Sequence, residues 1–176
     1  MSIIVCPLSR APLVARQHQP SHGISLLDPE TPFPALGLGE RHLQVDVHDI
    51  EVEMDGLDAC CDSRMATILD FGRRWERDAP ILIHCYAGIS RSTATAYIIA
   101  CLHNPETDEA LIARTLREAS PTATPNRRFV ALADAALGRK GRMGAAIEAI
   151  GRGFPRWPEI PEAEPFAIPS TYGAAA

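Results

Sequence analysis

The sequence has 176 residues, of which 46% are hydrophobic, and it carries a net charge of −5. This length suits one compact domain with a sizeable core, whereas the acidic balance disfavours nucleic acid and membranes as partners. No apolar run approaches the roughly 18 residues of a membrane span, and the first residues do not resemble a secretory signal. The five cysteines form no pair of Cys-x-x-Cys motifs, so we expect no metal site and free thiols in a cytoplasmic protein.

The first half of the chain alternates strand patterns with helices and loops. Strand patterns occupy residues 2–8, 22–29, 41–50 and 79–85. The third of these alternates apolar and polar residues, as a half-buried strand does, and the fourth is a continuous aliphatic run typical of the middle of a covered sheet. Residues 11–19 favour a short helix, and residues 58–77 have apolar positions at helical spacing, from Cys61 to Trp75. Residues 30–40 are rich in proline and glycine and indicate a loop.

The second half of the chain is predominantly helical. Helical patterns occupy residues 92–103, 108–119, 126–137 and 142–150. We expect Thr107 to cap the second of these helices. We expect Thr124 to cap the third, with Pro125 at its first position and Gly138 at its end.

The tail, residues 151–176, is rich in proline and glutamate. This composition predicts an extended strap or a mobile end rather than a second domain. Because strands come early and helices late, the sequence predicts one α/β domain over residues 1–150, with helices flanking a small, mostly parallel central sheet.

The segment ILIHCYAGISRSTATAYIIAC, residues 81–101, changes from a strand pattern to a helix pattern. The loop from Cys85 to Arg91 therefore leads into a helix N-terminus, where backbone N–H groups and the helix dipole favour an anion. Gly88 permits a backbone conformation that other residues resist. The guanidinium of Arg91 matches two phosphate oxygens, and these surroundings favour the thiolate of Cys85. The pattern predicts a thiolate nucleophile beneath a bound phosphoryl group.

The stretch HCYAGISRS, residues 84–92, resembles the signature of the cysteine-dependent protein tyrosine phosphatases: His-Cys, five residues, Arg, and Ser or Thr. The order Ala-Gly-Ile-Ser-Arg-Ser most resembles the dual-specificity branch, as in a small phosphatase of the bacterial type. Residues 120–137 are similar to the Ser-Pro … Pro-Asn … Phe segment of that branch. The resemblance covers most of residues 1–140 and implies the α/β fold of these phosphatases.

The resemblance also implies a role for each residue of the loop. Cys85 attacks phosphorus and forms a phosphocysteine, while Arg91 and the loop amides hold the phosphoryl oxygens. The amides belong to Tyr86, Ala87, Gly88, Ile89 and Ser90. Ser92 bonds to the sulfur and eases its departure, and His84 orients the loop and helps to keep the thiolate. The alternatives are a helix cap for Ser92 and a core histidine for His84. No cofactor or metal is required.

The family supplies the leaving-group proton from an Asp on a loop that follows an earlier strand. The candidates here are Asp46, Asp49, Glu53 and Asp55. Asp46 lies inside the alternating strand, so its carboxylate projects from the sheet. Asp49 lies where the alternation ends, at the sheet edge where ligands gather in α/β proteins. Asp55 has a spacing closer to that of the family but lies in a stretch that reads as a turn. We expect Asp49 to be the acid, with Asp55 as the alternative.

The chain is too short for the segment that deepens the pocket of the large tyrosine-specific phosphatases. The resemblance therefore implies phosphotyrosine as substrate, leaves phosphoserine and phosphothreonine open, and implies inorganic phosphate as product. Because the loop lacks extra basic residues, phosphorylated proteins or aryl phosphates are favoured over inositol lipids. The alternatives are a rhodanese-like sulfurtransferase, an arsenate reductase of the small phosphatase type, and a phosphate-binding module of low activity.

Overall fold

The structure, a computed structural model, describes residues 1–156 and 158–173. A five-stranded sheet forms its centre, in the order β3-β2-β4-β1-β5. The strands are β1 (Ser2–Pro7), β2 (His22–Leu27), β3 (His42–Asp46), β4 (Ile81–Cys85) and β5 (Phe166–Pro169). The first four strands pair in parallel, and β5 runs antiparallel to β1 at one edge. The predicted α/β fold with a mostly parallel sheet is therefore confirmed.

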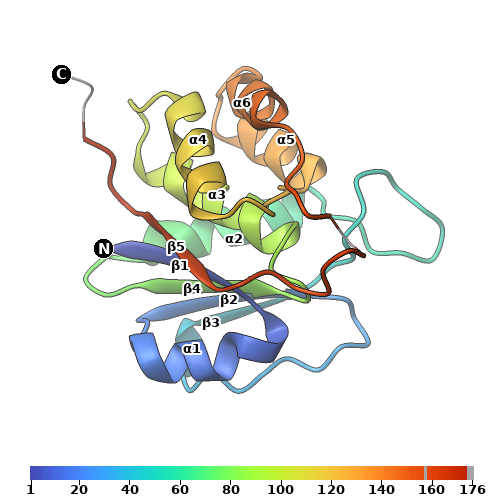
Figure 1. Cartoon of the computed structure of the whole chain (residues 1–176), viewed down its shortest axis with the longest axis vertical. Helices are drawn as coiled ribbons and strands as arrows, with labels where there is room; N and C mark the ends of the chain where they lie inside the picture. Colours follow the sequence, from blue (N-terminus) through green and yellow to red (C-terminus); the bar gives the residue numbers. More distant parts are fainter. Residues whose placement is uncertain (157, 174–176) are drawn as a thin grey trace.

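Helices cover both faces of the sheet unequally (Figure 1). The helix α1 (Ala11–His18) lies on one face, over a small cluster of buried residues. The other face carries α2 (Asp62–Arg74), α3 (Arg91–His103), α4 (Glu109–Ala119), α5 (Arg127–Ala136) and α6 (Arg142–Ile150). The main core lies between these helices and the sheet. No helix in the described ranges is long and apolar enough to cross a lipid bilayer.

The central strand and the helix that follows it are buried on all sides. All five residues of β4 are buried between β2 and β1. In α3 every residue from Arg91 to Cys101 is buried, because the sheet lies beneath the helix and α2, α4 and α5 surround it. A helix that is apolar all round is stable only in such a position. The loop that joins β4 to α3, residues 85–91, is therefore held at both ends by the best-packed part of the protein.

Two of the predicted helix caps are wrong by one or two positions. Asp108, not Thr107, caps α4, and its side chain accepts a hydrogen bond from a backbone N–H of the first turn. Asn126, not Thr124, caps α5 in the same way. The physical reason is that Asp and Asn accept these hydrogen bonds better than Thr does. The helix α2 begins at Asp62 rather than near residue 58, because residues 47–61 form a long loop that projects beyond the sheet (Figure 1).

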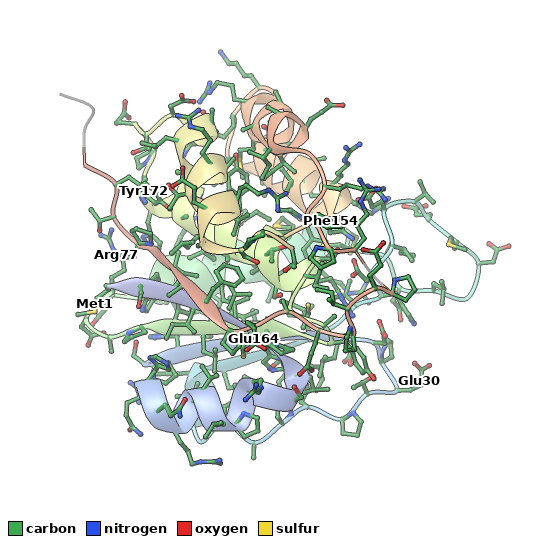
Figure 2. All side chains as sticks on the ribbon, viewed as in Figure 1. Met1, Glu30, Arg77, Phe154, Glu164 and Tyr172 are labelled. Carbon is green, nitrogen blue, oxygen red and sulfur yellow. The ribbon has the colours of Figure 1, made fainter. Side chains whose placement is uncertain are left out.

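The sequence did not predict β5. This strand lies within a segment that we call the C-terminal strap, which comprises the described residues 151–156 and 158–173. The strap leaves α6, crosses the end of the sheet and returns along β1 (Figure 1). Figure 2 shows Phe154 of the strap at the same end of the molecule as Glu30, which follows β2, while Met1 and Arg77 lie at the opposite end. The strap therefore passes over the carboxyl ends of the parallel strands. The last residues of the tail, 174–176, lie outside the described residues.

Candidate active site

The 85–91 loop turns its carbonyl oxygens outward. Three hydrogen bonds from surrounding segments fix this orientation: Leu8 N to Tyr86 O at 3.1 Å, Ala163 N to Ala87 O at 2.8 Å and Thr124 N to Ile89 O at 2.9 Å. Within the described ranges, no backbone N–H of residues 86–90 donates to a backbone carbonyl. Donors that lack an internal partner at a helix N-terminus form a ready site for an anion. The predicted phosphate cradle is therefore consistent with the backbone geometry.

Gly88 allows this loop to approach the end of β1. Its φ is +73°, in the left-handed region that favours glycine. A Cβ atom at this position would lie 2.9 Å from Pro7 N and 3.0 Å from the carbonyl carbon of Cys6. Both neighbours are backbone atoms of β1 and cannot rotate away. A side chain here would therefore displace either the loop or the strand.

Cys85 lies at the bottom of a cavity of about 560 Å³. Only 2% of the residue is exposed, and its Sγ lies 3.1 Å from the hydroxyl of Ser92. Ser92 is therefore not a helix cap here, and its hydroxyl faces the sulfur as the resemblance implied. Besides the 85–91 loop, the cavity is lined by Asp28, Asp49, Thr124, Arg152 and Arg156.

Arg91 is 3% exposed, and contacts on one side hold its guanidinium in place. Its Nη1 donates to Asp28 Oδ1 at 2.9 Å and to Val47 O at 2.7 Å. Its Nε lies 3.9 Å from Asp49 Oδ2 and is buried without a hydrogen bond to any described residue. The edge formed by Nε and Nη2 is the one that can hold two oxygens of one phosphoryl group. Arg91 is therefore oriented before a ligand binds, with this edge still available.

Of the four acid candidates, the structure brings only Asp49 into the cavity of Cys85. Two donors hold its Oδ1: the hydroxyl of Ser90 at 2.7 Å and the amide of Asn126 at 2.8 Å. Its Oδ2 makes no hydrogen bond with any described residue and lies 3.9 Å from Arg91 Nε.

The other acid candidates lie elsewhere. Asp46 ends β3 with an exposed side chain. Glu53 and Asp55 line a separate hollow on the 47–61 loop, where Glu53 pairs with Arg128 at 2.8 Å. None of these three carboxylates lines the cavity of Cys85.

His84 belongs to a buried chain of hydrogen bonds behind the loop. Its Nε2 lies 2.6 Å from the hydroxyl of Ser25, which lies 2.7 Å from Nε2 of His42. The Ser25 hydroxyl can donate to one imidazole while it accepts from the other, so the two Nε2 atoms take opposite hydrogen-bonding roles. Burial lowers the pKa of His84 to about 4, so the ring is neutral near pH 7. Any support that His84 gives to the thiolate therefore comes from position and hydrogen bonding rather than from charge.

Sequence reasoning missed Asp28, Thr124, Arg152 and Arg156, which line the cavity, and Asn126, which donates to Asp49. Asp28 directly follows β2 at the carboxyl edge of the sheet, so the rule that selected Asp49 could also have found it. For the two arginines the sequence holds no such signal, because only the course of the strap brings them to the cavity.

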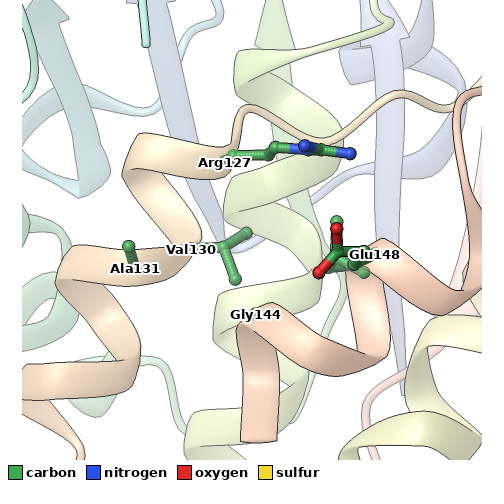
Figure 3. Close-up of a pocket in the computed structure, with 6 residues that line it drawn as sticks. Arg127, Val130, Ala131, Gly144 and Glu148 are labelled. Atoms are coloured by element: carbon green, nitrogen blue, oxygen red, sulfur yellow. The ribbon is translucent and has the colours of Figure 1, made fainter. Parts of the chain in front are cut away.

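Another hollow, of about 230 Å³, lies between α5 and α6 (Figure 3). Its lining residues are Arg127, Val130, Ala131, Gly144, Ile147 and Glu148. It contains no cysteine, serine or histidine that could act as a nucleophile. In the part of the chain that the structure describes, no three His, Cys, Asp or Glu side chains gather in a way that could hold a metal ion.

No protein-family model matches the sequence, and no curated protein matches it as a relative. Solved structures do resemble it. Human DUSP28 is 18% identical, with a TM-score of 0.54 over 76% of this chain and 84% of that chain. A mouse putative dual specificity phosphatase is 20% identical, with a TM-score of 0.51 over 79% and 81%. The human tyrosine phosphatase-like serine/threonine/tyrosine-interacting protein is 18% identical, with a TM-score of 0.54 over 77% and 91%. The chain therefore has the α/β fold of dual-specificity phosphatases.

Proposed function

We propose that this protein is a cysteine-dependent phosphomonoester hydrolase that dephosphorylates phosphotyrosine in proteins, and phosphoserine and phosphothreonine more slowly. The observation that carries the proposal is the position of Cys85 Sγ, which lies 3.1 Å from the Ser92 hydroxyl in the cavity that Arg91 also lines. The free edge of Arg91 and the unpaired amides of the 85–91 loop supply donors for the non-bridging oxygens of a phosphoryl group.

In the first step the thiolate of Cys85 attacks phosphorus. A sulfur–phosphorus bond forms and the bond from phosphorus to the leaving oxygen breaks, while Arg91 and the loop amides stabilise the charge on the remaining oxygens. The proton of the Asp49 carboxyl group passes to the leaving oxygen. A tyrosine phenolate leaves readily, whereas a serine or threonine alkoxide depends more strongly on this proton. The slower reaction of phosphoserine and phosphothreonine follows from that difference.

In the second step water cleaves the phosphocysteine. The Asp49 carboxylate accepts a proton from the water, whose oxygen attacks phosphorus and displaces the sulfur, and inorganic phosphate is released. The departing sulfur becomes a thiolate again, and the Ser92 hydroxyl can donate a hydrogen bond to it. His84 and Ser25 take no part in proton transfer and act as positioning residues, since they lie behind the loop.

Two features favour hydrolysis over the alternatives. A sulfurtransferase that acts on thiosulfate releases sulfite, which needs no proton, so it has no use for a carboxyl group such as Asp49 in the cavity of the nucleophile. A phosphate-binding module needs neither a nucleophile nor an acid, yet Cys85 and Asp49 line one cavity. An arsenate reductase of the small phosphatase type is disfavoured because its loop lies near the N-terminus, whereas here the loop follows the fourth strand of the chain.

The first test is the hydrolysis of p-nitrophenyl phosphate and of a phosphotyrosine peptide. Cys85→Ser should abolish turnover and retain vanadate binding, and EDTA should leave the wild type active. The matched control is Cys61→Ser, a partly exposed cysteine outside the cavity, which should retain turnover. Full activity of Cys85→Ser, or faster sulfur transfer from thiosulfate than phosphate release, would contradict the proposal.

The role of Asp49 is tested through the leaving group. Asp49→Asn should slow the hydrolysis of phenyl phosphate far more than that of p-nitrophenyl phosphate, because only the poorer leaving group depends on the proton. The basic limb of the pH profile should also flatten. Asp55→Asn is the matched control and should change neither. If Asp55→Asn shows this pattern and Asp49→Asn does not, the assignment of the acid is wrong.

A further inference from the structure

The cavity of Cys85 contains two arginines that the proposed reaction does not use. Arg152 and Arg156 belong to the C-terminal strap. They are far from the 85–91 loop in the sequence but line the same cavity. We propose that they form a second anion subsite, which selects phosphotyrosine peptides that carry a carboxylate or a second phosphate close to the phosphotyrosine. This inference rests on the proposed function and names the substrate class of the same site.

The charges of the cavity support a second anion. Arg91 faces the carboxylates of Asp28 and Asp49, which offset its charge. The guanidinium groups of Arg152 and Arg156 make no ion pair and no hydrogen bond with any described residue. Before the Cys85 thiolate is counted, the lining holds three arginines against two carboxylates, although the chain as a whole carries −5. An anionic group that enters beside the scissile phosphate would meet two cations without partners.

The backbone of the strap is fixed where it carries these arginines. Gly153 N donates to Thr124 Oγ1 at 3.0 Å, and Phe154 N donates to Pro121 O at 2.9 Å. The strap approaches residues 121–122 so closely that a Cβ atom at Gly153 would collide with their backbone. The two guanidinium groups therefore extend from a fixed stretch of chain. Such an arrangement lowers the entropy that a binding site must lose.

The cavity and its rim suit a peptide better than a small polyanion. A cavity of about 560 Å³ is far larger than one phosphoryl group needs. Tyr86, which lines the cavity, is 56% exposed, and Phe154, between the two arginines in the sequence, is 69% exposed. Aromatic rings of this kind pack against the side chains of a peptide. An inositol polyphosphate offers little apolar surface to them, so a peptide with acidic residues uses more of the site.

The experiment measures binding to the Cys85→Ser protein, which cannot turn the ligand over. Three fluorescent phosphotyrosine peptides are compared, in which the flanking residues are alanine, glutamate or phosphoserine, and inositol 1,4,5-trisphosphate is used as a competitor. We expect the glutamate and phosphoserine peptides to bind about tenfold more tightly than the alanine peptide, with a preference that weakens at high salt.

The test variant adds Arg152→Glu and Arg156→Glu, and this preference should disappear. The matched control adds Arg16→Glu on α1 and Arg114→Glu on α4, two exposed positions that do not line the cavity. It has the same change in net charge and should keep the preference. Equal affinity for all three peptides would overturn the inference, as would an equal loss in the control. Competition by the inositol phosphate that depends on the two arginines, without any peptide preference, would assign the subsite to a different ligand and overturn it as well.

The outcome is separable from that of the proposed function. Turnover of the alanine peptide that depends on Cys85 supports the hydrolase even if the subsite fails. Conversely, the binding preference is measured without turnover. A failure of the hydrolase assignment would therefore not change the measured preference, and the two results can be told apart.

Discussion

Gly88 provides a direct test of how closely the 85–91 loop depends on the end of β1. The perturbation is Gly88→Ala, which adds one methyl group. Its cost has two parts: the positive φ of +73° and the contacts of the new Cβ, at 2.9 Å from Pro7 N and 3.0 Å from the carbonyl carbon of Cys6. The matched control is Gly138→Ala at the end of α5, where φ is +65° and no atom lies within 4 Å of the added carbon.

The two variants share the backbone term and differ in the contacts. A left-handed conformation costs an alanine about 1–2 kcal/mol, and the lower entropy of the unfolded chain offsets part of this cost. Gly138→Ala should therefore lower the free energy of unfolding by about 1 kcal/mol. Gly88→Ala should lower the free energy of unfolding by about 1–3 kcal/mol more than Gly138→Ala does, because two backbone segments must separate. Relief of the contacts requires a movement of about 0.5 Å, since carbon atoms normally approach to about 3.5 Å.

This movement displaces the amides to which the proposed function assigns the phosphoryl group. Misplacement by about 1 Å can cost about a hundredfold in rate, so kcat/KM of Gly88→Ala should fall at least about tenfold. Urea unfolding gives the free energy of unfolding, and hydrolysis of p-nitrophenyl phosphate gives kcat/KM. Gly138→Ala should keep its activity. If the two variants have equal stability and equal activity, the close approach of the loop to β1 does not have the importance assigned to it.

Three further predictions concern residues around the loop. Because burial lowers the pKa of His84 from 6.5 to about 4, the unfolded chain binds a proton more readily, and the free energy of unfolding should fall by about 3 kcal/mol as the pH drops from 6.5 towards 4. His84→Gln should flatten this decline and the exposed control His18→Gln should not; equal declines in both would contradict the pKa. Iodoacetate at pH 6 should label Cys85 first and Cys61 second, since hydrogen bonds from Ser63 and Arg64 lower the pKa of Cys61, whereas burial raises that of the other three cysteines to about 12. Vanadate should protect only Cys85, and mass spectrometry that finds Cys61 labelled first would refute the order. Ser92→Ala should give a stoichiometric burst of nitrophenol followed by slow turnover in stopped-flow measurements, because the sulfur departs without its hydrogen bond; the absence of a burst would exclude that role.

The strand, turn and helix around Cys85 could be predicted because the residues of the candidate site there are contiguous. Cys85, Gly88 and Arg91 lie on one strand, one turn and one helix start, and each of these has a local signal: an aliphatic run, a glycine, and helical spacing of apolar residues. Burial of β4 and α3 on all sides follows from the same runs. Local patterns of this kind depend on neighbours in the sequence, which the sequence itself displays.

The rest of the cavity comes from pairs far apart in the sequence. Asp28 pairs with Arg91 across 63 positions, and Asp49 pairs with Asn126 across 77. No periodicity encodes such pairs, and only the order of strands in the sheet brings them together. The strand β5 was missed for a similar reason. It has four residues and ends in a proline, and its support comes from pairing with β1 at the other end of the chain and from the burial of Ile168 in the main core.

Asn126 shows how one side chain joins the fold to the candidate site. Its Oδ1 accepts from Phe129 N at 3.2 Å and caps α5, while its Nδ2 donates to Asp49 Oδ1 at 2.8 Å. Asn126→Asp separates the two roles, because aspartate caps a helix as well as asparagine does but has no N–H to donate.

We therefore expect the free energy of unfolding of Asn126→Asp to lie within about 1 kcal/mol of the wild-type value. That of Asn126→Ala should fall by about 1–2 kcal/mol, because this variant loses the helix cap. In the Asp variant two carboxylates face each other, so the side chain of Asp49 should turn away from the cavity. The kcat/KM of Asn126→Asp should then fall more for phenyl phosphate than for p-nitrophenyl phosphate, since only the former depends on the acid. Urea unfolding and the two substrates measure both effects. If Asn126→Asp keeps the leaving-group dependence of the wild type, Asn126 does not position the acid, and its contact with Asp49 is structural alone.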